Sequence, residues 1–159
     1  MSRLPNPSQL VFLSKLPGVE RWTKVRFLGW YVTWLWYYRP SAQNVRYSIT
    51  NYDVPSATLK LDHHYPAESA TTVSALVDIR SLVESIETSE LQDGSWINVV
   101  GYFTGVSAIQ TRDKRHSKAE KTAKRTVVKI EAVMIWSAGS FRIEDYEKSL
   151  QLRQAAVRE

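Results

Sequence analysis

The sequence predicts a small, closed β-barrel with added helices, built by a single domain that spans residues 1–159. The first observation is the segment 24–38, in which seven of fifteen residues are aromatic. Aromatic and β-branched side chains suit a pleated, half-buried surface, so this segment is expected to form one long strand. Gly29 in its middle predicts a bulge or bend, which would let one strand serve two parts of a barrel. The second observation is the alternation of apolar and polar residues through 45–51 and 57–62, which predicts the next two strands.

The other elements follow in chain order. Residues 1–9 are expected to be a flexible lead, and the apolar residues 10–16 end at the Pro17-Gly18 turn. After the first three strands, residues 73–77 are a candidate for a short additional strand. Asp78 is expected to cap a helix that ends at Gly94 and has an apolar face formed by Ile79, Leu82, Val83 and Ile86. Strands are then predicted at 96–106 and 126–136, followed by a C-terminal helix over 141–159.

A helix between the third and fourth strands of a five-stranded barrel is the arrangement of the OB-fold. That fold binds ligands with the face of strands 2–3 and with the loops that follow strands 1 and 4. Here the loop after strand 4, residues 107–125, is strongly basic. Seven basic and two acidic residues lie between Arg112 and Arg125, and the rest of the chain is neutral. The predicted topology and the charge distribution therefore point to the same place.

Several classes of function have no residues to support them. The chain has no Cys, which excludes disulfides and thiolate zinc sites. It has no apolar run long enough to span a membrane, and we expect no signal peptide. His63 and His64 are adjacent in a predicted strand and should point to opposite faces, while His116 lies in another loop, so no metal site is expected. No catalytic triad, phosphate-binding glycine loop or diagnostic carboxylate pair is present. We therefore expect no enzyme activity, no cofactor and no small-molecule substrate.

Four segments together resemble a known family. Residues 24–29 (KVRFLG), 59–66 (LKLDHHYP), 94–102 (GSWINVVGY) and 132–139 (AVMIWSAG), the last followed by Tyr146-Glu147, are similar to successive boxes of the fungal Ten-type small subunit of the CST telomere-capping complex. Against that pattern, residues 34–56 are longer and more aromatic, and residues 107–125 look like an inserted basic loop.

The resemblance implies a role in assembly. A Ten-type subunit pairs with a larger Stn-type OB-fold subunit through its barrel and its C-terminal helix, and through that partner with the large CST subunit. The assembly resembles the trimeric single-strand-binding protein RPA and binds single-stranded, G-rich telomere ends, to which this chain alone is expected to bind weakly. The expected location is the telomeric region of chromosomes in the nucleus. The alternatives are a free-standing binder of single-stranded DNA or RNA, and a structural adaptor without nucleic-acid contact.

The C-terminal helix carries an apolar stripe of Ile143, Tyr146, Leu150 and Val157. This stripe could cover the protein's own barrel or contact a partner helix, and the resemblance favours the partner. Strand 96–106 is apolar on both faces, so one face should be core and the other covered, and Trp96 is expected in the core. The residues expected to bind the partner are Met134, Trp136, Ile143, Tyr146, Glu147, Leu150 and Arg153.

Binding of a single strand requires a basic groove and exposed aromatic side chains for base stacking. The basic loop could meet the first requirement, although such a run can also be merely solvated. Tyrosines near the loop after strand 1 could meet the second, although a small barrel also needs aromatic side chains to fill its interior. The residues expected to bind nucleic acid are Arg26, Arg46, Tyr47, Lys60, Arg112, Lys114, Arg115, Lys118, Lys121, Lys124 and Arg125.

Overall fold

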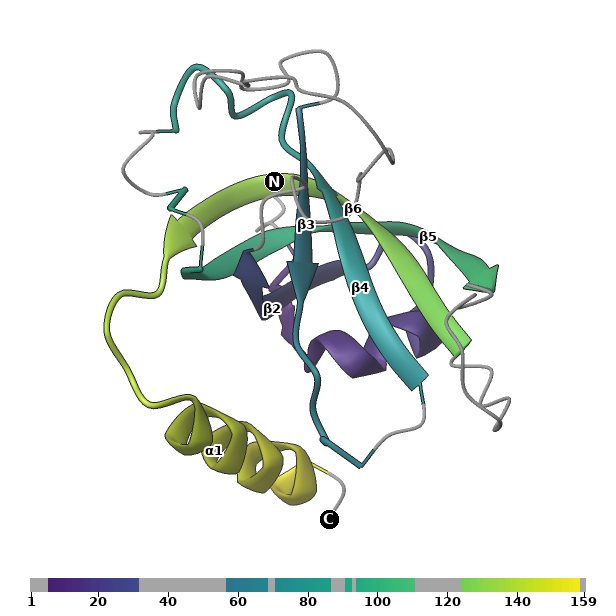
Figure 1. The fold of residues 1–159 in the computed structure, drawn as a ribbon, viewed down its shortest axis with the longest axis vertical. Coiled ribbons are helices and arrows are strands. Elements are labelled where there is room, and N and C mark those ends of the chain that lie inside the picture. The colour runs from purple at the N-terminus through teal and green to yellow at the C-terminus, as the bar shows by residue number, and fades with distance from the viewer. Residues whose placement is uncertain are drawn as a thin grey trace, which may run out of the picture.

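The computed structural model describes residues 6–31, 57–68, 71–86, 91–92, 94–110 and 124–157. These residues form a β-sheet, one 3₁₀ helix and one α-helix (Figure 1). The strands are β1 (Gln9–Leu10), β2 (Lys24–Tyr31), β3 (Thr58–Asp62), β4 (Thr71–Asp78), β5 (Trp96–Gln110) and β6 (Lys124–Ser137), and the helices are η1 (Leu13–Gly18) and α1 (Ile143–Ala156).

The sheet closes on itself. Its order is β2-β3-β4-β6-β5, and β5 pairs again with β2, which completes a ring of five strands. Neighbours in the ring are antiparallel except β4 and β6, which run parallel over Thr71–Asp78 and Lys124–Glu131. This confirms the predicted OB-fold barrel. The predicted short strand 73–77 is in fact a full barrel strand, β4, and the predicted strand 45–51 lies outside the described residues.

The segment after β4 differs from its prediction. Its described part, residues 79–86, forms successive hydrogen-bonded turns rather than a regular helix, with the Leu82 N–H donating to Ile79 O (2.8 Å) and the Ser85 N–H donating to Leu82 O (2.9 Å). Three of the four predicted apolar positions nevertheless face the barrel, because Ile79 is in the core and Leu82 and Ile86 pack against it. The fourth, Val83, is exposed, so its predicted place on the apolar face is wrong. Asp78 accepts a hydrogen bond from the Arg80 N–H (3.0 Å), as a helix cap would.

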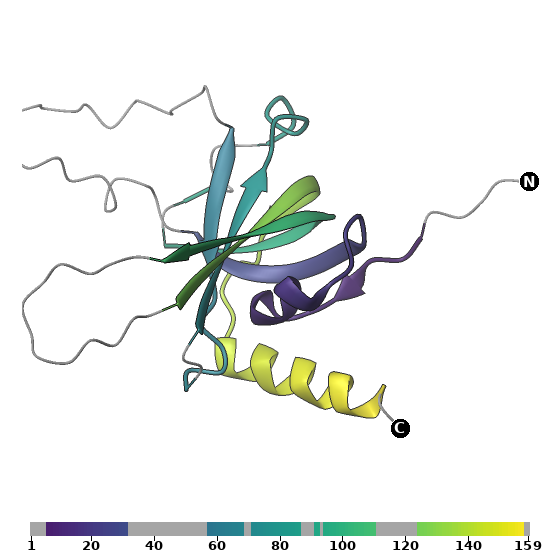
Figure 2. The same ribbon diagram turned by 90° about the vertical axis from the view of Figure 1, so that its right-hand side faces the viewer.

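The N-terminal segment also contributes to the core. β1 pairs parallel to β2, and the Val11 N–H donates to Arg26 O at 3.0 Å. Leu13 and Leu16 of η1 are fully buried, and with Val11 they join the cluster formed by Phe27, Leu61, Val99 and other inward-facing strand residues. Figure 2 shows η1 beside the barrel, on the same side of the barrel as α1.

The predicted bulge at Gly29 is wrong. β2 keeps an unbroken register with β5 from Lys24 to Trp30. The register shifts lie instead in the pairing of β5 with β6, where Val133 of β6 and Thr104 of β5 have no partner in the register. Gly29 is required for a different reason, since a Cβ added there would lie 2.6 Å from Leu61 Cβ. The glycine thus permits close approach of β2 and β3 rather than a bulge.

β5 and β6 form a longer hairpin than the sequence suggested. β5 extends to Gln110 and β6 begins at Lys124, so both ends of the predicted 107–125 loop are strand, while residues 111–123 lie outside the described part. The predicted C-terminal helix is confirmed as α1, which follows β6 after the connection 138–142 (Figure 1). Neither helix in the described ranges is both long and apolar enough to cross a membrane.

Candidate partner and nucleic-acid surfaces

The outer face of β2, β5 and β6 brings an apolar surface next to α1. In this face Met134 of β6 lies opposite Val100 of β5, which in turn lies opposite Arg26 of β2. Met134 is 56% exposed, and its neighbour Val133 is exposed as well. Large apolar side chains that gather on a surface mark sites of protein contact. Met134, a predicted partner residue, therefore lies on an exposed apolar surface.

Arg26, a predicted nucleic-acid residue, lies on this surface beside Trp136 and Tyr146. Its guanidinium carbon lies 5.2 Å from the centroid of the Trp136 ring, a cation–π contact. It also lies close enough to Tyr146 of α1 to affect that residue's titration. Burial raises the pKa of Tyr146 to about 12, and the positive charge of Arg26 opposes this rise more weakly. One predicted nucleic-acid residue is thus brought together with two predicted partner residues.

A cluster of aromatic rings lies where α1 meets the barrel. Its members are Phe12, His63, Tyr65, Trp96, Phe141 and Tyr146. Trp96 packs edge-on against His63 (5.1 Å between ring centroids) and contacts Trp30 on its other side (5.2 Å). The expectation that Trp96 fills the barrel core is therefore wrong. It is half-buried on the outer face, and Ile97, Val99 and Phe103 form the core side of β5.

Polar contacts and one leucine dock α1 on this cluster. His63 Nε2 and Glu147 Oε1 lie 2.9 Å apart, and the His63 side chain is almost fully buried. The Tyr65 hydroxyl donates to Gln151 Oε1 at 3.2 Å, and Leu150 is 2% exposed. Of the predicted stripe, Ile143, Tyr146 and Leu150 thus face the chain's own barrel, while Val157 is exposed.

The helix therefore covers its own barrel with the stripe that the resemblance had assigned to a partner. Its other side carries Leu152, which is exposed, and the predicted partner residue Arg153 is exposed too. Ile143 and Glu147 are half-buried at the boundary between the covered and open sides. Of the predicted partner set, Met134 and Arg153 are exposed, and Trp136 and Ile143 are half-buried.

Apart from Arg26, the predicted nucleic-acid residues fall into three groups. Lys60 lies on the outer face of β3, with its ammonium 3.6 Å from Asp62 Oδ2. Arg125 and Lys124 begin β6, opposite Ile109 and Gln110 of β5. The others lie outside the described residues and are Arg46, Tyr47, Arg112, Lys114, Arg115, Lys118 and Lys121.

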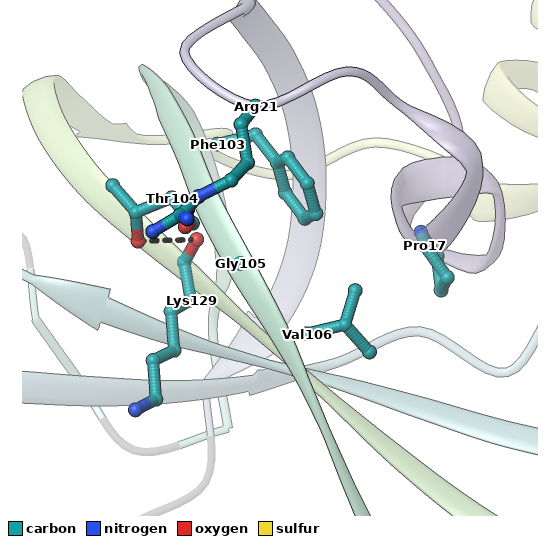
Figure 3. Close-up of a pocket in the computed structure, with 7 residues that line it drawn as sticks. All are labelled: Pro17, Arg21, Phe103, Thr104, Gly105, Val106 and Lys129. Atoms are coloured by element: carbon teal, nitrogen blue, oxygen red, sulfur yellow. Dashed lines mark hydrogen bonds between the residues drawn. The ribbon is translucent and has the colours of Figure 1, made fainter.

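Two features of these surfaces carried no sequence signal. His63 appeared only as half of an adjacent histidine pair, and its burial against Glu147 depends on α1 returning to the exit of β3. The second feature is a pocket of about 440 Å³, called here the Arg21 pocket. It lies beside the register shift at Phe103/Gly105, and the spacing of residues in the sequence does not reveal such a shift. It is lined by Pro17, Arg21, Phe103, Thr104, Gly105, Val106 and Lys129 (Figure 3).

No group of three or more His, Asp or Glu side chains in the described ranges converges as a metal site would require. The closed barrel, its ring order and the exposed apolar face beside α1 instead define a small OB-fold binding protein.

Comparison with known proteins identifies the family. Residues 1–151 match the family described as Ten1, telomere capping, CST complex subunit, and the chain belongs to that family. A chain of the S. pombe Stn1–Ten1 complex is 16% identical, with a TM-score of 0.56, and 94% of each chain is covered. The S. pombe telomere-capping protein Ten1 is 17% identical, with a TM-score of 0.55 over 94% of this chain and 99% of that one. At these identities the two structures show a shared fold. A search of curated proteins gave no match.

Proposed function

We propose that this chain is the small subunit of an RPA-like telomere-capping complex, and that it works by association rather than by catalysis. It pairs with an Stn-type OB-fold subunit and, through that partner, joins the large CST subunit. The assembled complex binds single-stranded, G-rich telomeric DNA at chromosome ends in the nucleus, and this chain adds to a DNA affinity that is weak when it is alone. Membership in the Ten1 family and the likeness to a chain of the Stn1–Ten1 complex support this proposal.

The observation that carries the partner assignment is the outer face of β6 beside α1. Met134 and Val133 are exposed there, Arg26 stacks on Trp136, and Phe141 is exposed at the entry to α1. The face thus combines a flexible thioether, an arginine and aromatic rings, which are the side chains enriched in protein interfaces. Its continuity with α1 fits a partner that contacts strand and helix together.

The test uses co-expression with an Stn-type partner. Met134→Arg should weaken heterodimer formation by about 2 kcal/mol, roughly 30-fold, because it places a charge in the centre of the proposed contact. The matched control is Val83→Arg, which changes another exposed apolar side chain in the turns after β4. Size-exclusion chromatography and calorimetric titration measure association, and thermal melting checks the fold of each variant.

The two outcomes are distinct. If Met134→Arg folds normally and still binds at wild-type affinity, the interface does not include the β6 face. Equal weakening by Val83→Arg would show that any added positive charge disturbs the complex, and would likewise contradict the assignment.

The nucleic-acid part of the proposal has its own support. Lys60 on β3 lies on the strand face that OB-folds use for ligands, and Arg125 lies at the start of β6, where the basic loop enters the sheet. A salt series on the assembled complex tests this part, as argued in the Discussion.

A further inference from the structure

The Arg21 pocket is open to solvent and has a positive lining. Two of its lining side chains, Arg21 and Lys129, are basic and none is acidic. Arg21 Nε donates a hydrogen bond to Thr104 O at 2.7 Å, which fixes the guanidinium beside the β5 register shift. In Figure 3 the Lys129 side chain extends away from the other lining residues, so its ammonium lies at the outer edge of the pocket. The pocket therefore offers an anion the hydrogen-bonded Arg21 guanidinium and, at its edge, the Lys129 ammonium, which also borders a second pocket that contains Asp78 and Glu131.

The rest of the lining is suited to a flat, partly apolar group. In Figure 3 the Val106 side chain projects from β5 toward the side on which Pro17 lies, and Val106 is 47% exposed. A Cβ added to Gly105 would meet no atom within 4 Å, so this side of β5 is open. The volume of about 440 Å³ falls in the range of sites that bind small ligands or parts of larger ones.

Trp22 adds an exposed aromatic ring directly next to Arg21 in the chain. It is 60% exposed, the highest exposure of any aromatic side chain in the described ranges. Its backbone has a φ of 65°, in the left-handed region that residues other than glycine rarely adopt, and its N–H donates to Phe103 O at 2.7 Å. A costly backbone conformation that presents a large ring to solvent is typical of a functional position.

We propose that Trp22, Arg21 and Lys129 form a contact site for single-stranded nucleic acid. Through Lys129 this site continues the outer face of β3, because Leu76 of β4 pairs with both Lys60 and Lys129. A base stacks on the Trp22 indole, the flanking phosphates bind Arg21 and Lys129, and a neighbouring nucleotide enters the Arg21 pocket. An exposed aromatic ring beside fixed positive charge is the combination that sequence-tolerant single-strand binding uses. This inference rests on the proposed function, because it assigns a second contact to the same nucleic-acid ligand.

The experiment measures binding of a fluorescein-labelled oligothymidylate to the complex with the Stn-type partner, in a salt series. Trp22→Ala should weaken binding by about 5- to 100-fold, and Trp22→Phe should keep most of the affinity because it keeps an aromatic ring. Lys129→Gln should lower the salt slope by about 0.7, since one phosphate contact is lost. Lys148→Gln, at an exposed position on α1, is the matched control and should change neither value.

Partner association and thermal melting are measured for every variant, so that loss of binding can be separated from loss of fold. Weaker binding by Trp22→Ala, with rescue by Trp22→Phe and normal association, supports the site. Superimposable curves for wild type, Trp22→Ala and Lys129→Gln would overturn it and leave the proposed function intact. An unmodified complex that binds a G-rich single-stranded oligonucleotide but no oligothymidylate would contradict this sequence-tolerant site and leave the proposed function intact. A complex that binds neither oligonucleotide would contradict the nucleic-acid part of the proposed function as well.

Discussion

At the scale of single residues, Arg26 shows how a fold changes the meaning of a charge. Its sequence context, a basic residue in an aromatic strand, predicted contact with nucleic acid. In the barrel, alternation along β2 places it on the outer face, where its guanidinium lies over the Trp136 ring and near Tyr146. A charge that packs on aromatic rings is already partly desolvated, so a protein partner can cover it at lower cost than a fully hydrated one.

Two glycines of β5 provide a matched pair of substitutions. A Cβ at Gly101 would lie 2.4 Å from Glu131 O and 2.8 Å from Ile130 Cγ2, whereas a Cβ at Gly105 would meet nothing within 4 Å. Gly101→Ala should therefore lower the free energy of unfolding by about 1–3 kcal/mol, because backbone must move. Gly105→Ala should leave it unchanged or raise it by up to about 1 kcal/mol.

Urea denaturation of both glycine variants measures the difference. Equal stability of the two would show that the register shift at Val100/Gly101 yields easily, and that the tight contact with β6 is not required for the barrel.

Tyr146 predicts a loss of stability in alkali. Burial raises its pKa to about 12 from 10.0, so the folded protein holds this proton more tightly than the unfolded chain does. The contribution to stability is complete below pH 10 and is lost as the pH rises from 10 to about 12. Melting temperatures between pH 9 and pH 11 should fall less steeply for Tyr146→Phe than for wild type. Parallel curves would mean that the hydroxyl is hydrated in the folded protein.

At the scale of elements, α1 is an amphipathic helix whose two sides have different tasks. One side docks on the barrel through Leu150 and the His63–Glu147 pair, and the other leaves Leu152 exposed. A helix held by few contacts can adjust its position when a partner binds, because little packing must be broken. The contacts of Leu150 and Glu147 with the barrel thus hold α1 in place, while its opposite side stays exposed.

Two leucines of α1 test this division. Leu150→Ala should lower the free energy of unfolding by about 2–5 kcal/mol, because the side chain is almost fully buried against the barrel. Leu152→Ala should change it by no more than about 0.5 kcal/mol, since that side chain is 64% exposed. Denaturant titration of the isolated subunit gives both values. A small effect of Leu150→Ala would indicate that α1 is not docked in solution.

At the scale of the whole molecule, charge and apolar surface are separated. The net charge of +5 is concentrated in the sequence between Arg112 and Arg125, which connects β5 to β6, while the exposed apolar face lies beside α1. In the proposed function, a protein partner covers the apolar face and the basic segment attracts nucleic acid. This separation predicts that binding of the protein partner and binding of nucleic acid can be weakened by separate substitutions.

Neutralising Lys114, Arg115, Lys118 and Lys121 together tests that separation. Each lost phosphate contact lowers the salt slope of single-strand binding by about 0.7, so the complex should bind more weakly, and more so at low salt than at high salt. Association with the Stn-type partner should be unaffected. DNA affinity of wild-type and variant complexes across a salt series provides the measurement. Superimposable curves would indicate that these charges only keep the protein soluble.

The sequence by itself determined the class of fold and the family. The aromatic first strand, the alternation in later strands, the order of elements and four short segments sufficed, because strand period and turn chemistry are local properties. It also placed apolar residues 79, 82 and 86 correctly toward the barrel, although it gave them the wrong local structure. Spacing alone cannot separate a helix from successive turns that bury the same positions.

Only the tertiary structure decided which side of each element is used. Trp96 lies outside the core because ring closure turns Ile97, Val99 and Phe103 inward. His63 meets Glu147, and Arg26 meets Trp136, across separations in sequence that no local pattern spans. The Arg21 pocket exists because the register of β5 shifts beside the turn that holds Trp22. Such contacts form only when the barrel closes. They depend on the pairing register of its strands, because a shift of one residue in that register moves every following side chain to the opposite face.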